Sequence, residues 1–62
     1  MNKKLKLKIV ERFGSQAEFS TRVSEDETVI SRVILERRKL NPERQRIWAK
    51  SLGCKIEDIF TQ

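Results

Sequence analysis

A chain of 62 residues with a formal net charge of +5 has room for one small hydrophobic core, so we expect residues 1–62 to form a single domain. The sequence contains no His, no Tyr and one Cys, and one chain therefore cannot assemble a nucleophilic triad or an ordinary zinc site. We expect no enzyme activity, no metal and no cofactor. Lys and Arg outnumber Asp and Glu by 14 to 9, which favours an anionic partner.

The sequence also bears on the compartment. No apolar run approaches the ~20 residues that cross a bilayer, and the Lys-rich start lacks the apolar region of a secretory signal. We therefore expect a cytoplasmic protein with no membrane partner. Cys54 has no second Cys for an internal disulfide and is expected to be a small core residue.

The first two helices are predicted from apolar spacing and a capping motif. Leu5, Ile9 and Phe13 recur at four-residue steps, on one face of a helix that Gly14 ends. Leu7 and Val10 lie on a different face, which indicates either deep packing or a partner. Ser15 then begins a Ser-x-x-Glu capping box, so a second helix starts at about Gln16 and stops near Ser24. Its expected inward residues are Ala17, Phe19, Ser20 and Val23.

The acidic run at residues 25–27 predicts the start of a third helix. Acids in a first turn stabilise a helix by ~0.3–1 kcal/mol each, because its unpaired amides carry partial positive charge. Asp26 as N-cap, or Ser24 with Glu27 as a capping box, would both begin the helix here. Its buried stripe is expected to be Ile30, Val33 and Ile34, with Thr28, Arg32 and Leu35 pointing nearly opposite.

The second half of the chain predicts two more helices, which makes the protein all-α. Asn41 as N-cap, Pro42 at the first helical position and Gly53 as a stop define a helix from Pro42 to Leu52. Trp48, Ala49 and Leu52 form its inward face. A last short helix carries Ile56, Ile59 and Phe60 at three- and four-residue spacing.

Two short helices joined by a tight turn, with polar residues facing outward on the second, meet the physical requirement of a helix-turn-helix. The segments GSQAEFSTRV, TVISRV and RRKLNPERQRIWAKSLG resemble the Cro/CI-type helix-turn-helix domain of phage repressors, XRE-type regulators and some antitoxins. The resemblance covers about residues 5–60. It implies a compact five-helix bundle, the lambda-repressor-like DNA-binding domain, with its recognition helix at about residues 27–36.

The resemblance also implies a DNA-binding surface. Gln16 would contact DNA, and the early exposed positions of the recognition helix would read bases. Arg can bind guanine, Gln adenine, Thr or Val the thymine methyl, and Glu the cytosine amino group. A basic cluster after the recognition helix is well placed for phosphates. The candidate DNA-binding residues are Gln16, Glu27, Thr28, Val29, Ser31, Arg32, Arg37, Arg38 and Lys39.

Six of these candidates have structural alternatives, and three positions depart from the family pattern. Arg37, Arg38 and Lys39 could only make a loop soluble. Gln16 could be a solvated first-turn residue, Arg32 could pair with Glu36, and Glu27 could only cap its helix. Ser24 stands where the turn usually has Gly, and Glu25 where an apolar residue is usual. Glu36 replaces a Gly that is common after the recognition helix.

The function that we predict is sequence-specific binding of double-stranded DNA by a transcriptional regulator, most like a small Cro-type repressor. Family members often pair through the C-terminal region, so we expect a homodimer on a palindromic operator, which could be weak until DNA is bound. The candidate dimer interface is Ile47, Ile56, Ile59 and Phe60. No small-molecule ligand is expected. The alternatives are an antitoxin or anti-repressor that mainly binds another protein, and a nonspecific nucleic-acid or membrane-surface peptide.

Overall fold

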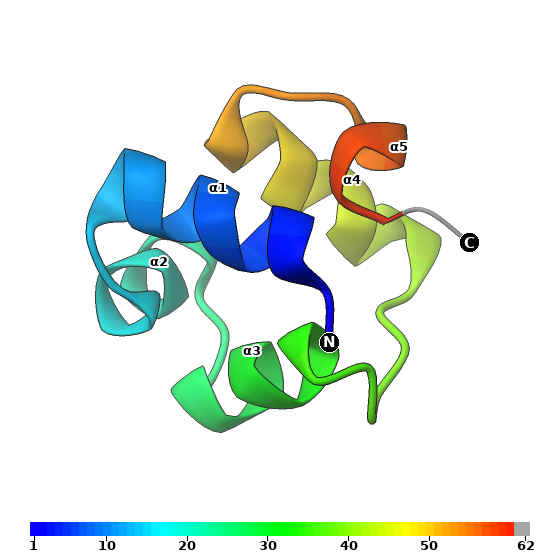
Figure 1. The fold of residues 1–62 in the computed structure, drawn as a ribbon, viewed down its shortest axis with the longest axis horizontal. Coiled ribbons are helices and arrows are strands. Elements are labelled where there is room, and N and C mark those ends of the chain that lie inside the picture. Colours follow the sequence, from blue (N-terminus) through cyan, green and yellow to red (C-terminus); the bar gives the residue numbers. More distant parts are fainter. Residues whose placement is uncertain (61–62) are drawn as a thin grey trace.

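The computed structural model describes residues 1–60, and five α-helices with no strand account for the secondary structure of that part of the chain (Figure 1). They are α1 (Lys3–Phe13), α2 (Gln16–Val23), α3 (Glu27–Ile34), α4 (Pro42–Leu52) and α5 (Ile56–Ile59). The prediction of an all-α fold is confirmed. The principal extents of 25 × 22 × 20 Å describe a rounded particle, in which α1 lies between α3 on one side and α4 and α5 on the other.

Local capping chemistry explains where the helices begin and end. Ser15 accepts a hydrogen bond from the Glu18 amide, and Asn41 accepts one from the Arg44 amide, so both predicted N-caps are confirmed. Gly14 and Gly53 follow α1 and α4 with φ of 84° and 68°, in the region that favours glycine. The predicted bounds of α4 are those observed.

Every helix contributes to one core. Trp48 is fully buried at its centre, with the Phe19 ring edge-on at 5.3 Å and the Phe60 ring at 6.1 Å. The predicted inward residues of α3 and α4 are all buried. The twelve buried apolar residues are Leu5, Ile9, Phe19, Val23, Ile30, Val33, Ile34, Leu40, Trp48, Ala49, Leu52 and Ile59.

The prediction of an inward position is wrong for one residue of α2. Ala17 is exposed, because it lies two residues from Phe19 and so points about 200° away from it on the helix. Phe19 and Val23, four residues apart, define the buried face instead. Ser20 is half-buried, and its hydroxyl donates to the Ala17 carbonyl at 2.7 Å.

Two helices end in left-handed residues that are not glycine. Ser24 (φ 56°) follows α2 and Glu36 (φ 61°) follows α3. The Glu25 amide donates to the Ser20 carbonyl at 3.1 Å, and the Arg37 amide donates to the Arg32 carbonyl at 2.9 Å. These are the hydrogen bonds of a glycine-type helix terminus. The third helix therefore ends at Ile34, two residues before the predicted end, and both turns keep the geometry that Gly normally provides.

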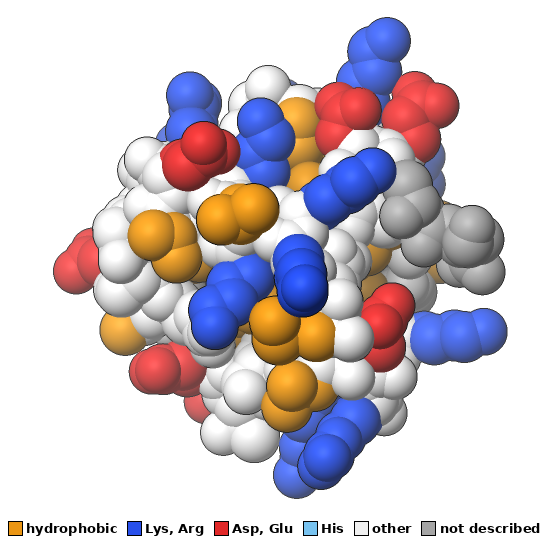
Figure 2. Space-filling view, viewed as in Figure 1, with side chains coloured by type: hydrophobic (Ala, Val, Ile, Leu, Met, Phe, Trp, Pro, Cys, Tyr) orange, Lys and Arg blue, Asp and Glu red, His pale blue; other side chains and the backbone are white. Residues whose placement is uncertain are grey.

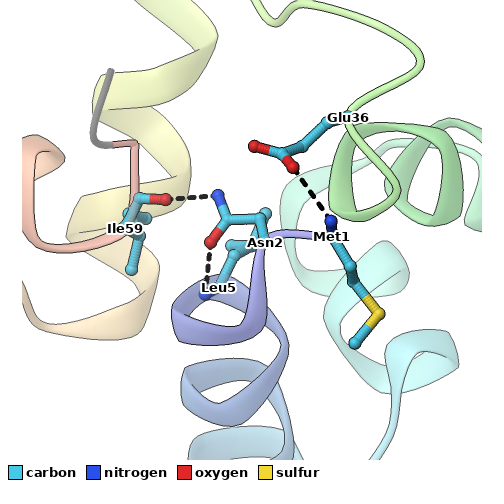
Figure 3. A network of polar contacts seen from close by, with 5 residues as sticks. All are labelled: Met1, Asn2, Leu5, Glu36 and Ile59. Carbon is cyan, nitrogen blue, oxygen red and sulfur yellow. Dashed lines mark hydrogen bonds and ion pairs between the residues drawn. The ribbon is translucent and has the colours of Figure 1, made fainter.

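The N-terminal residues join three helices (Figure 3). The backbone N–H of Asn2 donates a hydrogen bond to the Ile34 carbonyl at 2.6 Å. The Asn2 side chain forms hydrogen bonds with the backbone of both Leu5 and Ile59. Beside it, the Met1 ammonium lies 2.9 Å from a carboxylate oxygen of Glu36. The start of α1 is thereby tied to the ends of α3 and α5.

Candidate nucleic-acid interface

The outward face of α3 and the first turn of α2 share one shallow depression. It is lined by Gln16, Glu27, Thr28, Ser31 and Arg32. Glu27 and Ser31 are four residues apart on α3, as are Thr28 and Arg32, so all four lie on one side of the helix. Gln16 enters from the first turn of α2. The structure thus brings together five of the nine side chains predicted to contact DNA.

The buried side of α3 fixes which residues face outward. Ile30, Val33 and Ile34 are at most 5% exposed, and they lock the rotation of the helix about its axis. Thr28 and Arg32 are exposed as a result. Val29 differs from the other predicted contacts, because it is half-buried, packs against the core and does not line the depression.

The three acids at residues 25–27 have three different environments. The half-buried Glu25 carboxylate lies 3.8 Å from the Arg44 guanidinium on α4. Asp26 is the N-cap of α3, but its side chain forms no capping hydrogen bond. Glu27 is exposed, and within residues 1–60 its carboxylate takes part in no hydrogen bond or ion pair. The predicted capping box of Ser24 with Glu27 is wrong, since Ser24 instead ends α2 in a left-handed conformation.

The basic segment after α3 is exposed but separate from the first depression. Arg37, Arg38 and Lys39 all lie on the surface. Arg38 and Lys39 line a second depression, together with Asn2, Val33, Glu36, Leu40, Gln45 and Phe60. The structure therefore presents two neighbouring basic sets, Arg32 on the helix and residues 37–39 in the loop.

Arg32 does not form the surface ion pair that was its alternative role. Glu36, the acid expected to pair with Arg32, forms an ion pair with the Met1 ammonium instead. Sequence reasoning missed this pairing, and it missed the contact of Glu25 with Arg44. Both join residues far apart in the chain, and the left-handed turn that orients each acid has no glycine to indicate it.

The predicted dimer residues are not equally accessible. Ile47 is 38% exposed, and Ile56 and Phe60 are half-buried against the core. Ile59 is 0% exposed, so its prediction as an interface residue is wrong: it is the inward-facing residue of α5.

Two apolar side chains on α1 are more exposed than these: Leu7 at 63% and Val10 at 48%. This exposure excludes deep packing as the reason for their presence. Figure 2 shows apolar side chains interspersed with Lys and Arg on the side of the molecule that faces the viewer in Figure 1.

Comparisons of the chain with protein-family models, curated proteins and solved structures found no significant match. None of the helices within residues 1–60 combines the length and hydropathy that crossing a bilayer requires.

Proposed function

We propose that the protein is a sequence-specific regulator of transcription that binds double-stranded DNA through a helix-turn-helix formed by α2 and α3. In this arrangement α2 braces the motif and α3 enters the major groove. The observation that carries the proposal is the shared depression of Gln16 with Glu27, Thr28, Ser31 and Arg32. An amide, a carboxylate, two hydroxyls and a guanidinium on one exposed face supply the donors and acceptors that base edges require.

The charge distribution supports the same proposal. Arg37, Arg38 and Lys39 follow α3 directly and are exposed, so they can bind phosphates on the strand beside the groove. Glu25 is close to Arg44, which reduces its repulsion of DNA. A net charge of +5 on 62 residues adds long-range attraction to a polyanion.

The specific form that we propose is a Cro-like repressor that acts as a dimer. Two recognition helices about one turn of DNA apart, ~34 Å, would match a palindromic operator. The accessible parts of the predicted interface are Ile47, Ile56 and Phe60. The proposal involves no catalysis, cofactor or small-molecule ligand, and it places the protein in the cytoplasm.

A second candidate function is an antitoxin or anti-repressor module that mainly binds another protein. The observation that favours it is the exposure of Leu7 and Val10 on α1. Side chains that are 63% and 48% exposed are available to a protein partner. Co-purification of a stoichiometric partner from the native host would support this alternative.

The experiment that tests the main proposal is selection of bound duplexes from a random pool of double-stranded DNA. Affinity for the selected duplex and for a scrambled one is then measured across a salt series. We expect a palindromic sequence bound at least ~10³-fold more tightly than the scrambled duplex, with log affinity falling steeply with log salt. The absence of any enriched sequence, or equal affinity for both duplexes, would overturn the proposal.

A further inference from the structure

Glu27 is the one acid among the residues that line the depression on α2 and α3, whose other members are polar or basic. Glu25, two residues earlier, lies near Arg44, whereas the Glu27 carboxylate contacts no cation within residues 1–60. It is exposed at the first position of α3 and lines the same depression as Gln16 and Arg32. Partial positive charge at the start of α3 stabilises this carboxylate but leaves its oxygens free to accept hydrogen bonds.

An unpaired carboxylate in a DNA interface has few favourable partners. Phosphate oxygens repel it, and so do the O6 and N7 atoms of guanine and the O4 atom of thymine. The amino groups of cytosine and adenine both present an N–H donor to the major groove, but the adenine donor lies between two acceptors, its own N7 and the thymine O4, whereas the cytosine donor lies at the edge of its base pair beside the guanine O6 alone. A carboxylate opposite cytosine therefore gains a charge-assisted hydrogen bond with one neighbouring acceptor to repel it, and opposite adenine it meets repulsion from two.

We propose that Glu27 is a specificity-determining residue, which selects cytosine at one position of each half-site by accepting a hydrogen bond from the cytosine N4 amino group. This inference rests on the DNA-binding function proposed above. Glu27 lowers affinity for DNA in general, because its carboxylate repels phosphates. It restores affinity only where a cytosine lies within hydrogen-bonding distance of that carboxylate. The residue therefore acts mainly by rejecting wrong sequences.

The test uses the full chain and the duplex obtained from the random pool. Each base pair of the half-site is replaced in turn, and affinities are measured for the wild type, Glu27→Gln and Glu27→Asp. We expect one position at which replacing C·G by T·A weakens wild-type binding by about 10-fold or more. Glu27→Gln should lose most of that discrimination and bind scrambled DNA more tightly than the wild type. Glu27→Asp keeps the charge but shortens the side chain, so it should lose discrimination without the gain in nonspecific affinity.

A modified base provides a test that does not alter the protein. N4-methylcytosine keeps its pairing hydrogen bond with guanine but replaces the groove-facing N–H with a methyl group. At the identified position it should weaken wild-type binding by about 10-fold or more and should have little effect on Glu27→Gln. Elsewhere in the half-site it should not produce this difference between the two proteins.

Glu57→Gln is the matched control. Glu57 is also an exposed acid in the first turn of a helix, α5, which lies on the side of the molecule away from α3 in Figure 1. The variant makes the same change in net charge, so it should leave the base preferences unchanged. Base preferences that are identical in the wild type and Glu27→Gln would overturn this inference and leave the DNA-binding proposal standing. Failure to select any sequence would overturn both.

Discussion

The side-chain nitrogen of Asn2 donates a hydrogen bond to the backbone carbonyl of Ile59, across 57 positions of the chain (Figure 3). The oxygen of the same side chain accepts from the Leu5 amide at 3.1 Å and so caps α1. One amide group therefore satisfies an N–H at the start of the first helix and a C=O at the end of the last. Because it is partly buried, water cannot fully replace either bond.

We expect Asn2→Ala to lower the free energy of unfolding by about 1–3 kcal/mol, since it removes the cap and leaves the Ile59 carbonyl without its donor. Asn2→Asp keeps the capping acceptor but places a carboxylate against that carbonyl, so it should also destabilise. Urea denaturation followed by the fluorescence of Trp48, the one Trp of the chain, measures both.

Asn41 supplies the control for this prediction, because its side chain caps α4 at an exposed site and forms no second hydrogen bond within residues 1–60. Asn41→Ala should cost about 1 kcal/mol, and Asn41→Asp should cost little, because Asp is as good an N-cap as Asn. Equal effects of the two Asp variants would mean that the contact between Asn2 and Ile59 does not contribute.

Ser24→Gly is expected to stabilise the protein by about 0.5–1 kcal/mol. Ser24 has φ of 56°, a conformation that costs a residue with a Cβ ~1–2 kcal/mol, and Gly adopts it freely at the cost of a more flexible unfolded chain. The same substitution within a helix, Ser51→Gly in α4, should instead destabilise by about 0.5–1 kcal/mol. Thermal unfolding of the two variants should shift in opposite directions, and a loss of stability in Ser24→Gly would contradict the argument.

Glu36 combines a left-handed backbone with an ion pair to the Met1 ammonium. Glu36→Ala loses the ion pair and keeps the backbone cost, whereas Glu36→Gly loses the ion pair and removes that cost. We therefore expect Glu36→Gly to be more stable than Glu36→Ala by about 1 kcal/mol or more. The exposed ion pair itself is worth at most about 1 kcal/mol, and high salt should reduce its effect. Denaturation of both variants at low and high salt separates the two contributions.

Helix positions were predictable from the sequence because their causes are local. The side chains of Ser15 and Asn41 cap amides within the first turn of their own helices. Likewise, Gly14 and Gly53 end the helices that they directly follow. The exposed face of α3, which carries Thr28 and Arg32, followed from apolar spacing, whereas Gln16 on α2 was predicted from the resemblance to the helix-turn-helix family.

The features that the sequence did not predict depend on residues far apart in the chain. The burial of Ile59 requires α1 and α4 to pack around α5, and four residues of α5 carry too little pattern to indicate its inward side. The turns at Ser24 and Glu36 keep a left-handed backbone without glycine, so residue preference alone could not identify them. The pairing of Glu25 with Arg44 follows only once α2 and α4 are in contact.

Cys54 is expected to react slowly with alkylating reagents at neutral pH. Partial burial raises the pKa of its thiol, and Asp58 adds to this, while the positive charges of Lys8 and Arg12 oppose it. The rate of reaction with iodoacetamide, measured against pH, should therefore report a pKa above that of the same thiol in urea-denatured protein.

The raised pKa also predicts how the thiol affects stability. The folded state holds the proton more tightly than the unfolded state, so this contribution is fully present below the pKa of the unfolded-state thiol and is lost as the pH rises through the higher pKa of the folded state. Cys54→Ala should lose less stability than the wild type over that range. A wild type and a variant with parallel pH profiles would contradict the direction of the shift.

The proposed function predicts different effects for two arginines close together in the chain. Arg32 lies on the outward face of α3, and Arg32→Ala should weaken binding of the selected duplex by ~1–3 kcal/mol and relax preference at one base pair. Arg38 lies in the loop after α3, and Arg38→Ala should weaken binding to all duplexes alike. It should also reduce the slope of log affinity against log salt by about 1, because one phosphate contact is lost.

Lys50→Ala controls for the loss of one positive charge. Lys50 is exposed in the last turn of α4, which lies on the opposite side of the molecule from α3 in Figure 1. It should change neither the base preference nor the salt slope by the amount expected for the arginines. If Arg38→Ala altered preference at a single base pair while Arg32→Ala weakened all duplexes equally, the assignment of base contact to α3 and phosphate contact to the loop would be reversed.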